Sequence, residues 1–203
     1  MKPLFLTFEG IDGSGKTTQS RYLSNLLTDR NVPNIYTREP GGTGVAEAIR
    51  TLVLDPDFDI DVNTERLLFM AARSHHLQYK IKPALASGTS VVCDRYMDST
   101  LAYQCVSVSD MWDVQEWAYS MDWMLGPDYT FYLAIDADTA FKRMCDRGQN
   151  TDRTERDFEN RVHKMIELYE EMNDNYDHYI RIDATVNDSE VKAQIETAIS
   201  RLI

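Results

Sequence analysis

The most constraining feature of this 203-residue sequence is a glycine-rich segment near its beginning. Residues 10–17 read Gly-Ile-Asp-Gly-Ser-Gly-Lys-Thr and match the pattern G-x-x-x-x-G-K-[ST] in full. An apolar run, Leu4–Phe8, precedes the segment, and a helical pattern, Lys16–Thr28, follows it. Glycines let backbone N–H groups curl around phosphate oxygens, and the following helix adds its positive N-terminal end. The segment therefore predicts a phosphate-binding loop for a nucleotide.

Three side chains of this loop carry the expected chemistry. Lys16 can reach the β- and γ-phosphates of ATP, and the Thr17 hydroxyl can ligate Mg²⁺. Asp12 would be repelled by bound phosphates unless it meets a metal, a donor or an acceptor hydroxyl, and the alternative is an uninvolved surface carboxylate. The expected nucleotide-binding residues of the loop are Gly10, Ile11, Asp12, Gly13, Ser14, Gly15, Lys16, Thr17 and Thr18.

Short apolar runs alternate with helical-period segments along the chain, as in a parallel sheet that helices cover on both faces. The expected strands are Leu4–Phe8, Ile35–Thr37, Ser90–Cys93, Thr130–Ile135 and Tyr179–Ile182. The expected helices include Lys16–Thr28, Val62–Ala86, Val114–Leu125, Thr139–Asp146, Asp157–Tyr176 and Ser189–Leu202. Gly88 is the expected C-cap of the second of these helices. The sequence predicts a P-loop NTPase fold of three α/β/α layers with a five-stranded parallel sheet, in one domain spanning 1–203.

Segment 147–157 differs from the rest because it is dense in charge and has no apolar periodicity. It lies between two expected helices, and we expect a short mobile lid at about 143–157. The alternative is a solvated loop without a role, which composition alone favours.

Basic residues follow two further strands. Ser90–Cys93 is followed by Asp94, which is placed to hold Mg²⁺, and by Arg95, which suits bidentate capture of a phosphate. The alternative is a structural pair of Asp94 and Arg95. Arg38 lies in the segment Thr37–Thr43, after the preceding strand. Because the carboxyl ends of strands in an open α/β sheet share one crevice, we expect these groups to converge where two nucleotides meet.

The overall charge is acidic, at −12, from 21 Lys and Arg against 33 Asp and Glu. Such a chain has no general attraction for nucleic-acid backbones or anionic membranes. Cys93, Cys105 and Cys145 lack metal-ligand spacing, so we expect reduced thiols. The apolar run at the start is too short for a signal peptide, and no stretch reaches the length of a membrane span. We therefore expect a cytoplasmic protein.

Several sequence blocks together resemble the thymidylate kinase family over nearly the whole chain. They are FEGIDGSGKTTQ, TREPGGT, LLFMAARSHH, DRYMDSTLAYQ, PDYTFYLAID and DRTER, followed by YIRIDA. The resemblance implies a Mg²⁺-dependent transfer of the γ-phosphate of ATP to dTMP, which yields dTDP. It also implies a homodimer, through helices such as Val45–Leu54 and Val62–Ala86.

The resemblance assigns roles to residues on the acceptor side. The implied acceptor-binding residues are Asp12, Arg38, Phe69, Arg73, Arg95, Ser99, Thr100, Tyr103 and Gln104. Arg38 and Arg95 should clamp the acceptor phosphate, Phe69 should stack on thymine, and Arg73 should bind the base edge. Thr100 and Gln104 should contact the base, Tyr103 should disfavour a ribose 2′-hydroxyl, and Asp12 should meet the 3′-hydroxyl or organise the metal.

The residues themselves support these roles unequally. Phe69 lies on an apolar helical stripe, where its position alone predicts a core residue. Tyr103 fits an ordinary amphipathic surface aromatic as well. Arg73 lies in a mostly apolar helix and indicates a functional role, since a buried arginine needs an anionic or polar partner.

The phosphate-binding loop contains no arginine, so the lid should supply the cation for the transferring phosphoryl group, as in bacterial family members. Arg143, Arg147, Arg153 and Arg156 are available there. Arg153 is the preferred candidate for the γ-phosphate, and Arg143 or Arg147 should flank the adenine or the phosphates. The implied catalytic residues are Asp12, Lys16, Arg95 and Arg153.

Some positions depart from the family pattern. Cys105 and Thr100 replace a usual Gly and a usual Asn or Ser, Ile166 stands where a Tyr is common, and the lid is shortened around Thr154–Asp157. These changes leave open a kinase of broad specificity for deoxynucleoside monophosphates. A non-catalytic nucleotide switch is a second alternative, although the sequence has no N-K-x-D motif.

Overall fold

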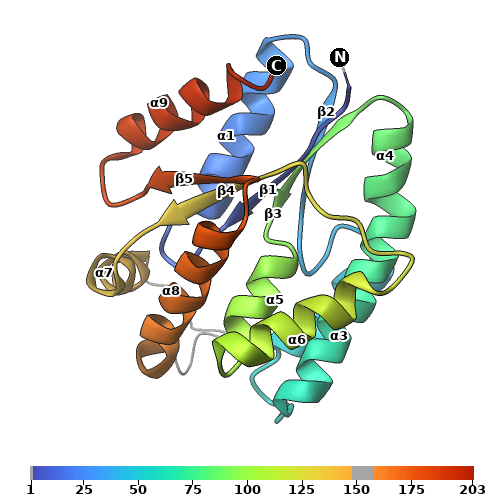
Figure 1. Cartoon of the computed structure of the whole chain (residues 1–203), viewed down its shortest axis with the longest axis vertical. Coiled ribbons are helices and arrows are strands. Elements are labelled where there is room, and N and C mark those ends of the chain that lie inside the picture. Colours follow the sequence, from blue (N-terminus) through green and yellow to red (C-terminus); the bar gives the residue numbers. More distant parts are fainter. Residues whose placement is uncertain (1, 148–157) are drawn as a thin grey trace.

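A computed structural model describes residues 2–147 and 158–203 of the chain. Its strands form one parallel sheet in the order β2-β3-β1-β4-β5 (Figure 1). The strands are β1 (Phe5–Glu9), β2 (Asn34–Arg38), β3 (Ser90–Asp94), β4 (Tyr129–Ala134) and β5 (Tyr179–Asp183). All five predicted strands are confirmed, each to within one residue at either end.

Helices follow or precede every strand. They are α1 (Lys16–Asp29), α2 (Gly44–Leu54), α3 (Val62–His76), the π-helical segment η1 (Leu77–Ile81), α4 (Lys82–Ala86), α5 (Met97–Gln104), α6 (Val108–Tyr119), α7 (Ala137–Arg147), α8 (Phe158–Asn175) and α9 (Asp188–Ile199). The connection from β1 to β2 runs in one direction along the sheet, and the later connections run in the other. Because such crossovers are right-handed, they place α1 on one face of the sheet and α3, α4, α5 and α8 on the other. The packing agrees, because α1 contacts α9 while α5 contacts both α3 and α8. The predicted three-layer fold is confirmed.

The long predicted helix Val62–Ala86 is continuous but not uniform, because the π-helical segment η1 separates α3 from α4. It ends as expected at Gly88, whose φ of 82° is left-handed. The N–H groups of Gly88 and Thr89 donate to the carbonyls of Leu85 and Ala84 at 3.0 Å each. These two bonds form a Schellman cap.

The predicted helix Val114–Leu125 is wrong in its placement. Helix α6 begins six residues earlier, where the Ser107 hydroxyl caps the N–H of Asp110 at 3.1 Å, and it ends at Tyr119. The residues that follow are held as a connection to β4, since the Leu125 carbonyl accepts a 2.6 Å hydrogen bond from the Tyr96 hydroxyl.

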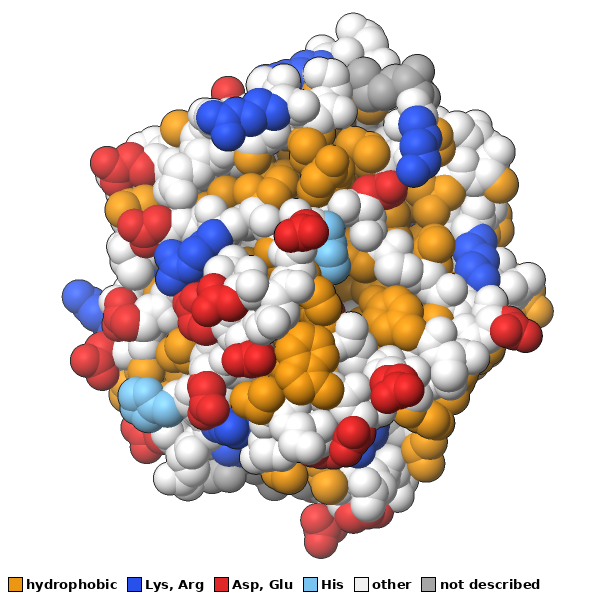
Figure 2. Space-filling model, in the orientation of Figure 1, with side chains coloured by type: hydrophobic (Ala, Val, Ile, Leu, Met, Phe, Trp, Pro, Cys, Tyr) orange, Lys and Arg blue, Asp and Glu red, His pale blue; other side chains and the backbone are white. Residues whose placement is uncertain are grey.

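The surface agrees with the acidic composition. On the face in Figure 2, Lys and Arg side chains are separated from one another by acidic, hydrophobic and uncharged ones. Within residues 2–147 and 158–203, no helix combines the length and the apolar character that crossing a membrane requires.

Candidate active site

The strand order fixes where a ligand can bind. From β1 the chain crosses toward β2, whereas from β3 it crosses to β4 on the other side of β1. The neighbouring strands β1 and β3 therefore form a topological switch point, and ligands of open α/β sheets bind outside the carboxyl ends of such strands. The loop that follows β1 and the Asp94-Arg95 pair at the end of β3 both lie there.

The phosphate-binding loop depends on glycine at specific positions. Gly13 has a φ of 83°, and a Cβ atom there would lie 2.5 Å from the carbonyl oxygen of Ala140 on α7. Gly10 has a φ of 137°, and a Cβ atom there would lie 2.7 Å from the carbonyl oxygen of Leu133. The loop thus passes so close to neighbouring backbone that only glycine fits, as its sequence predicts.

Lys16 is buried beneath this loop. Its Nζ atom donates to the carbonyl oxygen of Ile11 at 2.7 Å and lies 3.9 Å from Oδ1 of Asp12. Burial, and then the positive charge of Arg95, lower the pKa of Lys16 to about 8. The neighbouring groups only partly offset the cost of burying the charge of Lys16, so an approaching phosphate would strongly stabilise its charged form.

The structure brings together the two predicted magnesium ligands. The Thr17 hydroxyl donates to Oδ2 of Asp94 at 2.5 Å. The other carboxylate oxygen, Oδ1, is buried and has no hydrogen-bond partner in the described part of the chain. Within the described residues no group of three His, Cys, Asp or Glu side chains is placed to hold a metal. One carboxylate and one hydroxyl suit Mg²⁺, which keeps several waters and binds substrate phosphates.

Arg95 directly follows β3. Its φ of 69° is left-handed, and its guanidinium donates to Asp12, to the Ser99 hydroxyl at 3.3 Å, and lies 5.0 Å from the ring centroid of Tyr103. The Tyr103 hydroxyl also donates to Asp12, at 2.9 Å. Asp12 is therefore not an uninvolved surface carboxylate, because it connects the phosphate-binding loop to Arg95 and Tyr103.

Arg38 lies at the end of β2, in register with Asp94 on β3. Its guanidinium donates to Glu47 of α2 at 2.9 Å, and both side chains are about half exposed. Glu47 also accepts from the N–H of Gly42 at 2.8 Å, and this bond, with Arg38, lowers the pKa of the Glu47 carboxyl. Arg38 is therefore accessible and already faces an anion.

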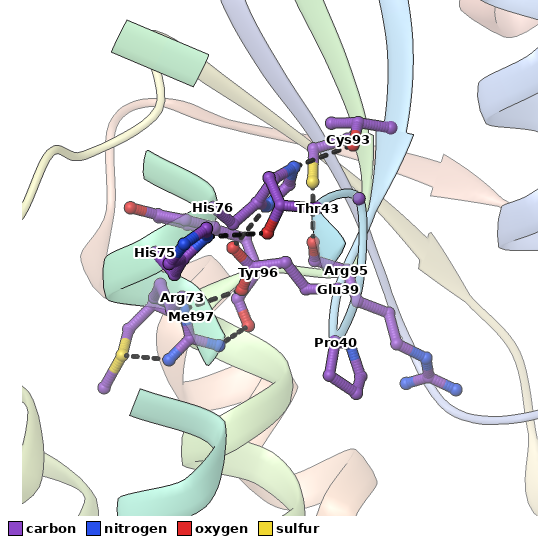
Figure 3. A network of polar contacts seen from close by, with 12 residues as sticks. Glu39, Pro40, Thr43, Arg73, His75, His76, Cys93, Arg95, Tyr96 and Met97 are labelled. Atoms are coloured by element: carbon purple, nitrogen blue, oxygen red, sulfur yellow. Dashed lines mark hydrogen bonds and ion pairs between the residues drawn. The ribbon is translucent and has the colours of Figure 1, made fainter. Parts of the chain in front are cut away.

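Arg73, on α3, is almost fully buried and lies in the polar network of Figure 3. Its Nε atom donates to Oε2 of Glu39 at 2.8 Å. Its Nη2 atom donates to the carbonyl oxygen of Tyr96 at 2.8 Å and to the hydroxyl of Thr100 at 3.0 Å. The inference that Arg73 has polar partners is confirmed, and Thr100 is one of them.

Gln104 and Phe69 are the other two residues that are predicted to contact the base. The side-chain amide of Gln104 donates to Glu65 at 2.7 Å, and Phe69 is half-buried on α3. Thr18 is exposed at the start of α1.

On the nucleotide side, Arg143 of α7 approaches the phosphate-binding loop. Its guanidinium lies 3.5 Å from the carbonyl oxygen of Gly13 and 3.4 Å from that of Val186. Arg147 is the last residue of α7. The predicted roles of Arg153 and Arg156, and most of the lid, fall outside the described residues.

Glu9 and Glu39 are two of the buried acidic residues that the sequence did not single out. Glu39 binds Arg73, and Glu9 accepts from the Tyr96 N–H at 2.6 Å, the Ser99 hydroxyl at 2.6 Å and the Tyr169 hydroxyl at 3.0 Å. Burial raises the pKa of Glu9 despite these bonds. A charged residue at the end of an apolar strand is the signal that could have identified Glu9, whereas Glu39 follows the less buried strand β2 and carries no such signal.

Tyr169 bears on the departure at Ile166. It lies three residues further along α8, so the two positions lie on neighbouring parts of one helical face. Tyr169 is fully buried, whereas Ile166 only packs against the edge of the core. Helix α8 thus brings the hydroxyl of Tyr169, and no side chain of position 166, to Glu9.

The sheet order, the glycine loop and the group of Lys16, Thr17 and Asp94 define a P-loop nucleotide-binding protein. The profile of the family described as Thymidylate kinase matches residues 8–195. The chain is 42% identical over 182 residues to the thymidylate kinase of Enterococcus faecalis, covering 84% of each chain. It is 37% identical over 195 residues to that of Ligilactobacillus salivarius, covering 92% of each. The chain belongs to the thymidylate kinase family.

Proposed function

We propose that this protein transfers the γ-phosphate of ATP to dTMP and releases ADP and dTDP. The observation that carries the proposal is the placement of basic side chains after the carboxyl ends of three neighbouring strands, β2, β3 and β1. Lys16 and the glycine loop follow β1, and Arg38 and Arg95 lie at the ends of β2 and β3. The family membership supports the same activity.

Phosphoryl transfer needs alignment and charge neutralisation more than covalent participation of the protein. On the donor side, Lys16 would exchange its bond to the Ile11 carbonyl for the β- and γ-phosphates of ATP. Mg²⁺ would be held by Thr17 and Asp94, and when bound it neutralises charge between these phosphates. The orphaned oxygen of Asp94 supports this assignment.

On the acceptor side, Arg38 and Arg95 would hold the attacking phosphate in line with the γ-phosphate. A phosphate monoester has its second pKa near 6, so the attacking oxygen is already ionised at neutral pH and needs no strong base. Asp12, between Arg95 and Tyr103, would meet the 3′-hydroxyl of the acceptor or organise the metal. We assign the cation for the transferring group to the lid, with Arg153 preferred.

The base pocket would be formed by α3 and α5. Arg73 would donate to the base edge and Phe69 would stack on the ring, with Ser99, Thr100 and Gln104 nearby. Tyr103 would disfavour a 2′-hydroxyl. Arg143 and Arg147 would flank ATP.

The proposed assembly is a homodimer through α2 and α3. Exposed apolar side chains on these helices support it, namely Val45, Leu52, Val62 and Leu67. The cytoplasmic location stays a prediction of the sequence.

An ADP-release assay with ATP and Mg²⁺ tests the function, with dTMP, dUMP, dCMP, dGMP, dAMP and UMP offered separately. We expect dTMP to be preferred and dUMP to follow. Comparable turnover of several deoxynucleotides would establish the broad-specificity kinase instead. ATP binding without turnover of any acceptor would favour the nucleotide switch.

A further inference from the structure

The guanidinium of Arg73 is not held equally on all sides. Its Nε and Nη2 atoms donate to strong oxygen acceptors, namely Glu39, the Tyr96 carbonyl and the Thr100 hydroxyl. Among the described residues, its Nη1 atom has only the thioether sulfurs of Met70 and Met97 as partners, each at 3.2 Å. Thioether sulfur is a weak acceptor. Nη1 is therefore the nitrogen that gains most when a carbonyl oxygen replaces its present partners.

The acceptor that fixes Arg73 is itself fixed. Glu39 is 4% exposed, and its second carboxylate oxygen, Oε1, lies 3.0 Å from Nδ1 of His76. Because an ionised carboxylate only accepts, His76 donates from Nδ1. Its other nitrogen, Nε2, lies 2.7 Å from the Thr37 hydroxyl. The chain of contacts thus runs from β2 through His76 and Glu39 to Arg73 (Figure 3).

Backbone contacts hold the same network in place. The N–H of Glu39 donates to the carbonyl oxygen of Asp94 at 2.9 Å, which ties this residue to the end of β3. A Cβ atom at Gly42 would lie 2.5 Å from both Nε2 of His76 and the Thr37 hydroxyl oxygen. Gly42 therefore leaves space for the contact between His76 and Thr37.

We propose that Glu39, held by His76 and Thr37, is a positioning residue that orients Arg73 so that Nη1 donates to a carbonyl of the acceptor base. This inference rests on the proposed function, which puts the base beside Arg73. A guanidinium has donors only, so in this fixed orientation it can donate to the carbonyl of thymine but finds no acceptor in the amino group of cytosine. Glu39 thereby contributes to base selectivity without touching the base.

A merely structural ion pair would behave differently. Loss of a structural pair lowers thermal stability and affects all substrates alike. Loss of a positioning residue changes recognition of the acceptor base and leaves ATP unaffected, since Glu39 follows β2 and lies outside the phosphate-binding loop. The ratio of kcat/KM for dTMP to that for dCMP distinguishes the two roles.

The first test is Glu39→Gln, which keeps the shape of the side chain and removes its charge. We expect KM for dTMP to rise about tenfold, the preference for dTMP over dCMP to fall about tenfold, and KM for ATP to stay within about twofold. Glu116→Gln, on the exposed surface of α6, is the matched control and should change none of these values. An unchanged preference in folded Glu39→Gln protein would overturn the proposal.

Thr37→Val is the second variant, because Glu39→Gln leaves a buried arginine without its counter-charge and can fail to fold. It keeps the pair of Arg73 and Glu39 and removes only the hydroxyl beside His76. We expect a change of about threefold in the same preference, without a change in KM for ATP. No change in preference in this variant, with normal circular dichroism, would also overturn the proposal.

Calorimetric titration of dTMP and dCMP without ATP separates this inference from the proposed function. If the wild-type protein binds dTMP in preference to dCMP and both variants keep that preference, only the positioning role fails. If the wild-type protein shows no preference for dTMP, the proposed function fails as well.

Discussion

The proposed donor side and the proposed acceptor side of the site are built in different ways. The donor side uses eight consecutive residues, 10–17, whose glycines bring the backbone close to its neighbours. The acceptor side uses arginines from β2, α3 and the end of β3, which are far apart in the chain. A backbone site is specified by a local motif, whereas a side-chain site depends on tertiary contacts that orient each group.

The charges on the two sides are also compensated differently. Each acceptor-side arginine is bound to one carboxylate: Arg38 to Glu47, Arg73 to Glu39 and Arg95 to Asp12. Lys16 on the proposed donor side donates to a backbone carbonyl and lies 3.9 Å from Asp12, the carboxylate that also binds Arg95, and burial lowers its pKa. Each of the three arginines thus has a carboxylate within hydrogen-bond distance, whereas Lys16 has only a longer contact with a carboxylate that it shares with Arg95.

Lys16→Ala should have the largest effect. It removes the cation that contacts the transferring phosphates, so we expect kcat to fall on the order of a thousandfold. The affinity for dTMP in the absence of ATP should stay within about threefold, because the acceptor-side arginines keep their partners. Steady-state kinetics and calorimetry give the two values. An equal loss of dTMP affinity would contradict the separation of the two sides.

Gly13→Ala should have the next largest effect. The new Cβ atom would lie 2.5 Å from the Ala140 carbonyl oxygen, in a left-handed residue, so we expect the free energy of unfolding to fall by about 3 kcal/mol. KM for ATP should rise by tens of fold, which is the size of effect expected when one well-placed contact to a substrate is lost. Denaturant unfolding and kinetics measure these changes.

Gly88→Ala is the matched control for that prediction. Gly88 has a nearly identical φ, 82°, but no atom lies within 4 Å of the added Cβ position. We expect a loss of about 1 kcal/mol and unchanged kinetics. Equal losses in the two variants would mean that backbone strain, and not the close approach to α7, dominates at Gly13.

A change of pH should have the smallest effect, and it should change the activity and the free energy of unfolding in opposite directions. The pKa of Lys16 is lowered from 10.5 to about 8, so kcat/KM for ATP should fall by about tenfold per pH unit above pH 8. Between pH 8 and 10.5 the unfolded chain binds the extra proton, so the contribution of Lys16 to the free energy of unfolding rises with pH. Lys16→Arg should lose both trends, and a wild-type profile that is flat to pH 9 would refute the assignment.

The sequence was sufficient for the features that depend on local pattern. The five strands and the glycine loop were predicted from apolar runs and one motif, and the Gly88 cap from a single residue. Helix α6 was misplaced because the helical period continues past Tyr119, whereas the bond from Tyr96 to the Leu125 carbonyl holds the following segment outside the helix. Helix α5, which carries the predicted base contacts Thr100 and Gln104, was not predicted as an element.

The site could be predicted only in part for the same reason. The sequence identified Arg38, Arg73 and Arg95, because arginines beside strand ends or within apolar helices stand out. It did not identify Glu39 or His76, because their importance arises from contacts between β2 and α3. Such pairs become visible only when the strands are in register.

The carboxylates that hold Arg38 and Arg95 have a consequence for the end of the catalytic cycle. In the proposed reaction the arriving phosphate must displace Glu47 and Asp12 from these arginines. The free energy of breaking these two ion pairs therefore reduces the net binding free energy of the acceptor. The same two carboxylates remain attached to α2 and the phosphate-binding loop, ready to re-engage the arginines as the diphosphate departs. They therefore limit how tightly the product is retained and favour its replacement by the next acceptor.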